Sequence, residues 1–421
     1  MSRPAAASLP SLEDFATLSV EVVSDPRHFL TLEPLWNGLV EKTGIDHPFL
    51  RHEWFRTWWE CFGAGKTLMI LLVRSAGEVV GIAPLMRTRS WMYGLPVRRL
   101  QFIYNVHTPR CDFIISTAPE QVHRAILEFL LAGREPWDLM ELNQVLAGSP
   151  TLETLARVAE TRRLPLGFWH SQDSPYLSFA GTWEDYLKRL SQGHRAKMRS
   201  KLTRLGQAGP VGLEIVAGEE NLKEALEDGL RIEAMAWKGE AGTAILSRPE
   251  VGVFYKAYAR RAAECGLLRL IFLRVNRKRI AFAYAVCYRK KIYVLKTGYD
   301  PEYAPLSPYN LLCFLLFQDG FRSGLSEYEF LGGSEEWKLQ WSRDARAHHW
   351  MFLFQDSLRG RLLHLIKFGL VRGLNRMRIY GNARDAILGT GRPASGQRPQ
   401  HEVAGSAAIE GGGGLQPWKS R

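Results

Sequence analysis

The sequence predicts an α/β (α+β) protein with two successive domains, each built on a mixed, mostly antiparallel sheet flanked by helices. Its length of 421 residues suits two domains better than one. The order strand hairpin, further strand, helix, strand occurs twice along the chain, as expected for tandem copies of one fold. A helical extension and a disordered tail are expected at the C-terminus, because residues 390–421 are rich in Gly, Pro and Ser.

The first copy begins near Leu68. The apolar runs MILLVR and VVGIAPLMR flank the turn SAGE and predict a hairpin. Further strands are expected around residues 100–104 and 112–115, followed by an apolar-periodic helix over about 120–131. The run DLMELN (138–143) completes this copy as a strand.

The second copy begins at Leu268 and carries a clearer pattern. The runs LRLIFLRV, IAFAYAVCY and KIYVLKTGY are separated by short polar turns and predict three successive antiparallel strands. A helix over about 308–322 and the strand EYEFL (327–331) follow. This order repeats that of the first copy.

Helices are expected between the two copies. Thr182 and Asp185 have the spacing of a capping box that opens a helix, and Gly193 is expected to interrupt it. Further helices are predicted over about 220–237 and 250–265. The predicted organisation is a flexible N-terminus (1–17), two domains (18–172 and 173–356), a basic amphipathic helix (357–389) and a disordered tail (390–421).

Composition excludes several classes of protein. The five cysteines lie far apart without a C-x-x-C or a nearby His cluster, so we expect neither a metal site nor a disulfide framework. The N-terminus lacks the apolar region of a signal peptide, and no apolar run approaches the roughly 20 residues that span a bilayer. We therefore expect a cytoplasmic protein.

The net charge of +12 is concentrated at the C-terminus. Residues 357–421 hold 11 Lys and Arg against 3 Asp and Glu, which leaves only +4 for the rest of the chain. The folded body therefore needs no specific nucleic-acid partner. The segment 357–389 can form a basic amphipathic helix, which either packs on the second domain or makes peripheral contact with an anionic membrane at the inner face.

The most informative segment is KTGYDPEYAPLSPYNLLCFLLF, where a strand ends and an apolar helix begins. Ser307 is expected as N-cap and Pro308 as first helical residue, with Tyr309 and Asn310 next. The unpaired N–H groups of such a helix start suit a pyrophosphate. Capped helices after strands are nevertheless common.

The chain resembles the Gcn5-related N-acetyltransferases (GNAT), specifically the branch associated with bacterial cellulose and exopolysaccharide synthesis and related to the FemAB-like peptidoglycan transferases. Four blocks carry the resemblance in the order that this family has them: HRAKMRSKLTRL (194–205), RIEAMAWKGEAGTAI (231–245), TGYDPEYAPLSPYNLL (297–312) and FLGGSEEWKLQW (330–341). It implies tandem GNAT-like domains and acyl-CoA, such as acetyl-CoA, as donor. It also implies direct attack by an acceptor amine or hydroxyl of a small molecule or saccharide.

The resemblance and the placement of acidic and phenolic groups suggest catalytic residues. Asp300 and Glu302 are candidates for the base, and Tyr299 or Tyr303 for protonating the leaving thiolate. Asp300 followed by Pro301 is equally a natural turn pair.

The block GGSEEWK supplies further candidates. Glu336 and Lys338 are expected at a polar donor or acceptor pocket, with Trp337 as a packing wall, although an exposed Glu/Lys pair on a short helix is an equal alternative. The family likeness adds Lys238 to the substrate-binding candidates.

A basic helix precedes these blocks, with Arg195, Lys197, Arg199, Lys201 and Arg204 beside an apolar stripe. It is either a solvated face or a contact for CoA phosphates, a lipid-linked sugar phosphate or a tRNA backbone.

Tyr309 stands where the family usually has Gly, and its side chain is expected either to crowd a bound pyrophosphate or to change the donor. The primary hypothesis is an acyltransferase of polysaccharide or envelope biosynthesis. The alternatives are an aminoacyl-tRNA-dependent transferase and a catalytically degenerate scaffold of a polysaccharide synthase.

Overall fold

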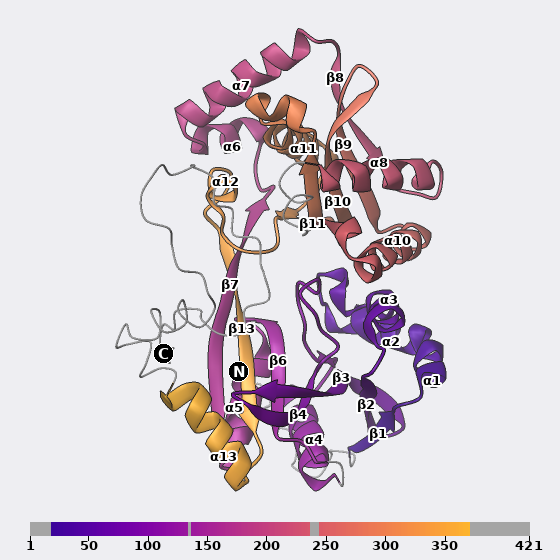
Figure 1. Cartoon of the computed structure of the whole chain (residues 1–421), viewed down its shortest axis with the longest axis vertical. Coiled ribbons are helices and arrows are strands. Elements are labelled where there is room, and N and C mark those ends of the chain that lie inside the picture. The colour runs from indigo at the N-terminus through magenta and orange to yellow at the C-terminus, as the bar shows by residue number, and fades with distance from the viewer. Residues whose placement is uncertain (1–17, 134–135, 236–243, 371–421) are drawn as a thin grey trace, which may run out of the picture.

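The computed structural model describes residues 18–133, 136–235 and 244–370. Its strands form one long sheet in the order β1-β2-β3-β4-β6-β13-β7-β12-β11-β10-β9-β8, and the short β5 pairs with β3 (Figure 1). The first half of the chain builds one end of this sheet and the second half builds the other. This is the tandem α/β architecture expected from the sequence.

The described elements of the first half are β1 (Ser19–Val23), α1 (Pro26–Thr31), α2 (Glu33–Thr43), η1 (Pro48–Leu50), α3 (His52–Phe62), β2 (Thr67–Ser75), β3 (Glu78–Met92), β4 (Leu95–Phe102), β5 (Ile114–Ile115), α4 (Pro119–Ala132), β6 (Leu139–Leu146), α5 (Pro150–Thr161) and β7 (Leu166–Ser178). The predicted hairpin, helix and final strand of the first copy are confirmed as β2–β3, α4 and β6. The strand expected over 112–115 shrinks to the two residues of β5.

The described elements of the second half are α6 (Trp183–Arg189), α7 (Gln192–Gly206), β8 (Val211–Val216), α8 (Leu222–Ala234), η2 (Ile245–Ser247), α10 (Pro249–Glu264), β9 (Leu268–Val275), β10 (Lys278–Tyr288), β11 (Lys291–Tyr299), η3 (Pro301–Leu306), α11 (Pro308–Ser323), β12 (Glu327–Glu329), α12 (Glu336–Leu339), β13 (Ala345–Phe354), α13 (Leu358–His364) and a π-helical turn η4 (Leu365–Leu370). The three antiparallel strands β9 to β11 and the helix α11 are confirmed.

The helices before the second sheet differ in one point from the expectation. Thr182 does cap α6, since its hydroxyl accepts from the Asp185 N–H at 3.1 Å. The interruption expected at Gly193 is wrong: the helix breaks at Leu190, and Ser191 caps α7 through a bond from the His194 N–H at 3.2 Å. Gly193 is an ordinary residue of the first turn, because a side-chain cap decides a helix start more strongly than a nearby glycine.

Two strands cross between the halves. β7 leaves the first half and pairs with β12 of the second, while β13, late in the chain, pairs with β6 of the first. β7 and β13 also pair with each other from Pro175 and Ala345 to Leu166 and Leu353. The expected domain boundary at residues 172 and 173 falls inside β7, and the division into independent domains stays a prediction.

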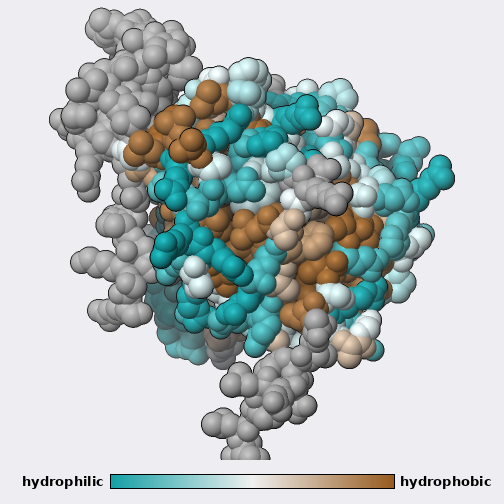
Figure 2. Space-filling model, turned by 90° about the horizontal axis from the view of Figure 1, so that it is seen from below, coloured by the Kyte–Doolittle hydropathy of each residue, from teal (hydrophilic) through white to brown (hydrophobic). Residues whose placement is uncertain are grey.

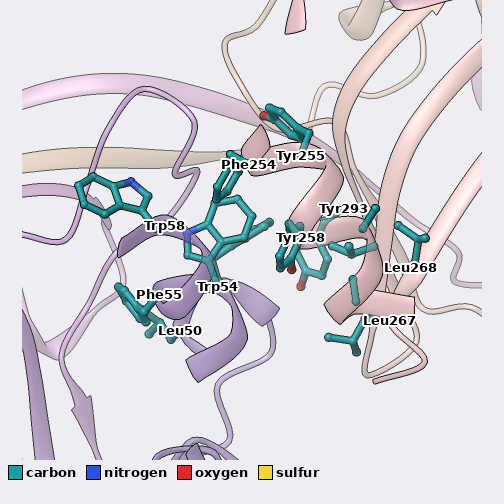
Figure 3. Close-up of a cluster of buried hydrophobic side chains, with 14 of the residues drawn as sticks. Leu50, Trp54, Phe55, Trp58, Phe254, Tyr255, Tyr258, Leu267, Leu268 and Tyr293 are labelled. Carbon is teal, nitrogen blue, oxygen red and sulfur yellow. The ribbon is translucent and has the colours of Figure 1, made fainter. Parts of the chain in front are cut away.

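A shared apolar core joins the two halves where α3 meets α10. Trp54 packs edge-on against Phe254 and Tyr258, with ring centroids 5.3 and 4.7 Å away, and Phe49 packs against Tyr293 of β11 at 5.5 Å (Figure 3). Separate cores lie under α4 and α5 in the first half and under α6, α7 and α11 in the second. Burial of large aromatic rings at the junction therefore fixes how the two halves sit.

The C-terminal extension is helical as far as the structure describes it. α13 and η4 continue from β13 to residue 370. The remainder of the predicted helix (371–389), the predicted tail (390–421) and the predicted flexible N-terminus (1–17) lie outside the described residues. Within the described part of the chain, no helix is long and apolar enough to cross a membrane.

Candidate functional site

A gap opens in the sheet between β11 and β12. The two strands pair in parallel over only three residue pairs, of which Tyr293 with Glu329 is the last. Beyond this pair the chain leaves β11, and the Phe330 N–H donates to the Pro175 carbonyl of β7 at 3.1 Å. β11 continues to Tyr299, well beyond its last pair with β12. The strands thus form a V with its apex at Tyr293 and Glu329.

A β-bulge sits on the β11 arm of this V. In the pairing of β10 with β11, Tyr284 lies opposite Lys296 and Ala285 lies opposite Val294, so Leu295 is the extra residue. A bulge twists the strand and turns its backbone groups away from the regular ladder. The backbone of β11 is therefore redirected exactly where the gap begins.

The start of α11 differs from the expected cap. Ser307 has a left-handed backbone (φ 51°, ψ 60°), and its side chain caps nothing. Its hydroxyl instead accepts from the Lys201 ammonium at 2.6 Å. Pro308 is the first helical residue as predicted, so the free N–H groups at the positive end of the helix lie beside a lysine.

The basic helix α7 adds positive charge at this point. It packs against α11 and η3. Burial, followed by the charges of Lys197 and Arg204, lowers the pKa of Lys201. Among the residues that the structure describes, Lys197, Arg199 and Arg204 have no acidic partner. The helix start is therefore strongly cationic, which favours phosphate contact over a merely solvated face.

The side chains of Tyr309 and Asn310 turn into the core. The Tyr309 hydroxyl lies 3.1 Å from that of Tyr328, and its ring packs edge-on against Trp337 at 5.4 Å. The side-chain amide oxygen of Asn310 accepts from the Trp341 indole N–H at 3.0 Å. The expected crowding of a pyrophosphate by Tyr309 is therefore wrong, because its ring is buried beneath the helix against Tyr328 and Trp337.

The predicted carboxylates after β11 face the β9–β10 hairpin. Lys278 lies 2.9 Å from the Asp300 carboxylate and 2.8 Å from that of Glu302, with its ammonium over the Tyr303 ring. Asp300 also accepts from the Glu302 N–H at 3.0 Å, which gives it the turn role. A charged cavity of about 340 Å³ between α8 and this hairpin includes Asp300 in its lining. Tyr299 ends the β11 arm and packs partly buried on the core of the second half.

The loop after β12 is anchored by Lys338. This side chain is buried, donates to the carbonyl oxygens of Leu331 at 2.7 Å and Gly333 at 2.9 Å, and contacts the Glu335 carboxylate. Burial lowers its pKa. Lys338 therefore holds the shape of the loop instead of facing a ligand.

The other candidates of this block lie around it. Glu336 is exposed at the first residue of α12, and Trp337 packs between Tyr309 and Phe330. A role of Trp337 as the wall of a pocket stays a prediction. Lys238 lies outside the described residues. Among those that are described, no group of three or more His, Cys, Asp or Glu is arranged to hold a metal ion.

A buried ionic cluster occupies the apex of the V, and the sequence did not reveal it. The Glu329 carboxylate lies 2.8 Å from the Arg110 guanidinium and 2.6 Å from that of Arg346. Burial raises the pKa of Glu329 to about 7 although both arginines oppose this shift. Arg110 belongs to the loop between β4 and β5 of the first half, so both halves build the apex. No local sequence pattern indicates the ion pair of Arg110 with Glu329, because the two residues are far apart in the chain.

The wall opposite α11 is formed by α8. A Cβ added to Gly298 would lie 2.5 Å from the Glu233 Cα, so only glycine permits this approach of α8 to β11. Glu233 itself is buried and accepts from the Ile245 N–H at 2.9 Å. The β11 arm is thus enclosed by α8 on one face and adjoins the cationic helix start on the other.

This arrangement can be compared with known proteins. Residues 192–339 match the family model described as "Acetyltransferase (GNAT) domain". The matched residues lie in the second half and make up less than half of the chain. The match covers the α7 basic helix, the gap, the α11 start and the Lys338 loop.

Solved structures resemble the whole chain in fold. FemX covers 83% of this chain and 99% of its own, at 13% identity and a TM-score of 0.52. The C-terminal domain of a putative lysylphosphatidylglycerol synthetase from Agrobacterium fabrum covers 80% and 95% at 11% identity and 0.49, and L-PGS from Bacillus licheniformis covers 82% and 96% at 14% identity and 0.48. These identities speak for the fold alone, and no curated protein matches the chain.

Proposed function

We propose that this protein transfers an acyl group from acyl-CoA to an amine or hydroxyl of a small-molecule or saccharide acceptor in bacterial polysaccharide or cell-envelope synthesis. The observation that carries the proposal is the conjunction of the open gap, the bulge at Leu295 and the cationic start of α11. A thioester with a phosphate-bearing tail needs these three features together. The GNAT family match supports the class of reaction.

The proposed donor lies along the β11 arm. Its pyrophosphate meets the N–H groups at the start of α11 and the Lys201 ammonium, since both are positive and close together. Its pantetheine lies in the opening between β11 and β12 beyond the last pair, Tyr293 with Glu329. A backbone N–H near the bulge then stabilises the oxyanion that forms on the thioester carbonyl.

Transfer follows by direct attack. The acceptor nitrogen or oxygen bonds to the carbonyl carbon, the C–S bond breaks, a base takes up the proton of the acceptor, and an acid protonates the departing thiolate. The proton held by the base then restores the acid. We propose Glu329 as this base, because it lies at the apex of the gap and is buried beside two arginines. Asp300 and Glu302 are held by Lys278 and are not used in this mechanism. Tyr299 stays the proposed donor of a proton to the thiolate.

Exchange of Glu329 for glutamine tests this assignment. Glu329→Gln should lower kcat by about a hundredfold or more, the usual contribution of a general base, while acyl-CoA binding measured by calorimetry stays unchanged. Because the pKa of Glu329 is raised to about 7, activity of the wild type should rise as the pH passes upward through that value.

Glu327→Gln is the matched control. Glu327 lies on the same strand and pairs with Arg346 at 2.8 Å, but it is not paired with Arg110. Because the Glu327 carboxyl helps to raise the pKa of Glu329, its variant should keep a rate close to that of the wild type while the rise in activity moves to lower pH. An unchanged rate in Glu329→Gln would remove Glu329 from the mechanism without affecting the proposed reaction.

Two other functions remain to be separated by ligand binding. An aminoacyl-tRNA-dependent transferase is favoured by the FemX-like fold and by the basic helix α7. A degenerate scaffold loses its main support, since Tyr309 is turned into the core. Calorimetry with acetyl-CoA and longer acyl-CoAs should show binding; turnover of aminoacyl-tRNA without binding of any acyl-CoA would contradict the proposed donor.

A further inference from the structure

A stripe of exposed leucines runs along the C-terminal helix. The side chains of Leu358, Leu362 and Leu365 are 91%, 47% and 56% exposed. Their spacing places them on one face, since residues three and four apart lie above one another on a helix. Gly360 and Leu363 are buried on the other face, against the sheet. The leucines therefore contribute nothing to the core of the protein.

The tip of the β3–β4 hairpin lies beside this helix. Met92 and Leu95 of the hairpin pack against the same apolar cluster as Leu363, and the Arg359 guanidinium contacts the Pro96 carbonyl oxygen. At this tip Trp91 is 70% exposed and Tyr93 is 47% exposed.

Figure 2 looks at this end of the molecule and shows hydrophobic residues on its surface among hydrophilic ones. Two large aromatic side chains of the hairpin tip and three leucines of the adjoining helix are exposed. Exposed apolar groups gathered in this way mark a surface that another body covers.

The chemistry of this surface fits a lipid bilayer. Trp and Tyr are the side chains preferred at the boundary between lipid and water, and a leucine face on a short helix suits insertion in the plane of that boundary. Residues 357–421 add charge of the right sign, with 11 basic against 3 acidic residues. Phospholipid surfaces that carry negative charge attract such a segment.

We propose that the leucine stripe of α13 and the Trp91–Tyr93 hairpin tip form a docking surface for an anionic phospholipid membrane. The surface is separate from the acyl-transfer site and does not depend on the proposed reaction. Figure 1 places α13 at one end of the long axis and α11 in the opposite half. Docking therefore leaves the start of α11 open to a water-soluble donor.

Sedimentation with lipid vesicles tests this surface on the full chain. The wild type should sediment with vesicles containing phosphatidylglycerol and stay in solution with vesicles of phosphatidylcholine alone. In the triple variant Leu358→Gln, Leu362→Gln, Leu365→Gln, the fraction of protein bound to vesicles should be at least fivefold smaller than in the wild type. Trp91→Gln combined with Tyr93→Gln should lower binding to a smaller extent, because two interfacial aromatic anchors are removed.

Leu246→Gln is the matched control, since Leu246 is 48% exposed on η2 in the other half of the molecule and should bind like the wild type. Urea unfolding verifies that each variant is folded, as expected for exposed positions. Equal sedimentation of the triple variant would overturn the proposal. Vesicle binding only after removal of residues 371–421 would also overturn it, by showing that the chain covers its own stripe. A dimer that dissociates in the triple variant would identify a second copy as the occupant instead.

Discussion

The two halves of the protein share one backbone arrangement at corresponding positions, where a strand is followed by the start of a helix. Each has a central helix that begins with a left-handed residue followed by proline: Ala118 and Pro119 before α4, Ser307 and Pro308 before α11. Each helix connects two strands that pair in parallel over three residue pairs, β4 with β6 and β11 with β12. The similarity of these backbones indicates that both halves share one fold.

The surroundings of the two helix starts differ. In the first half, Glu120 lies in the first turn of α4 and pairs with Arg124 and Arg157 at 3.6 and 3.5 Å, whereas α11 has no acid in its first turn and has Lys201 beside it. The positive end of the first helix therefore already has a carboxylate beside it, whereas the positive end of the second has a lysine.

The gap beside each helix differs as well. In the first half, the loop between β4 and β5 enters the gap, and the Cys111 N–H donates to the Gln144 carbonyl of β6 at 3.2 Å. The same loop carries Arg110 to Glu329 in the second half. The loop of the first half therefore fills the gap of its own half and contributes Arg110 to the apex of the gap in the second half.

The largest expected effect concerns the open gap. Gly298→Ala places a methyl group 2.5 Å from the Glu233 backbone, so α8 has to move away from β11. We expect the acyl-transfer rate to fall by about a hundredfold, since small displacements of reacting groups have effects of this size. Gly212→Ala on β8 meets nothing within 4 Å and is the control. Wild-type rates in Gly298→Ala would show that the gap is not the place of transfer.

An intermediate effect is expected where the halves meet. His348 is buried on β13, and burial lowers its pKa to about 3. Because the unfolded chain binds a proton near pH 6.5 and the folded chain does not, His348 stabilises the fold above that pH and loses this contribution as the pH falls. It amounts to about 2 kcal/mol between pH 6.5 and 5.

Urea unfolding at several pH values measures this contribution. The free energy of unfolding of His348→Gln should fall less steeply with acidification than that of the wild type, while the exposed His28→Gln should follow the wild type. Parallel curves for His348→Gln and the wild type would mean that His348 is protonated in the folded protein.

The smallest effect separates the two helix starts directly. Lys201→Ala should raise the dissociation constant of acyl-CoA about tenfold, the size expected for a lost charge-assisted bond to phosphate. Glu120→Ala in the first half should leave it unchanged, because that gap is already filled. Calorimetry measures both. If only Glu120→Ala binds acyl-CoA more weakly, the donor site lies in the first half and not in the second.

Sequence periodicity predicted the elements of the second half well. The strands β9 to β11 and the helix α11 could be predicted because their apolar runs are bounded by short polar turns. Pro308 indicated where the helix begins. The role of Ser307 could not be predicted, because its hydroxyl can accept a hydrogen bond either from the N–H groups of the helix or from Lys201. The packing of α7 brings Lys201 close enough to form the second of these bonds. Tyr309 and Lys338 were misjudged for the same reason: whether a side chain points into the core or outward depends on its neighbours in space.

The sequence by itself determined the tandem α/β fold and the start of α11 after a strand, because both depend on local sequence pattern. The tertiary structure decided the exchange of β7 and β13 between the halves and the buried contact of Arg110 with Glu329. These features join residues from opposite halves of the chain. Their energy comes from burial and charge pairing, which exist only after the chain has folded.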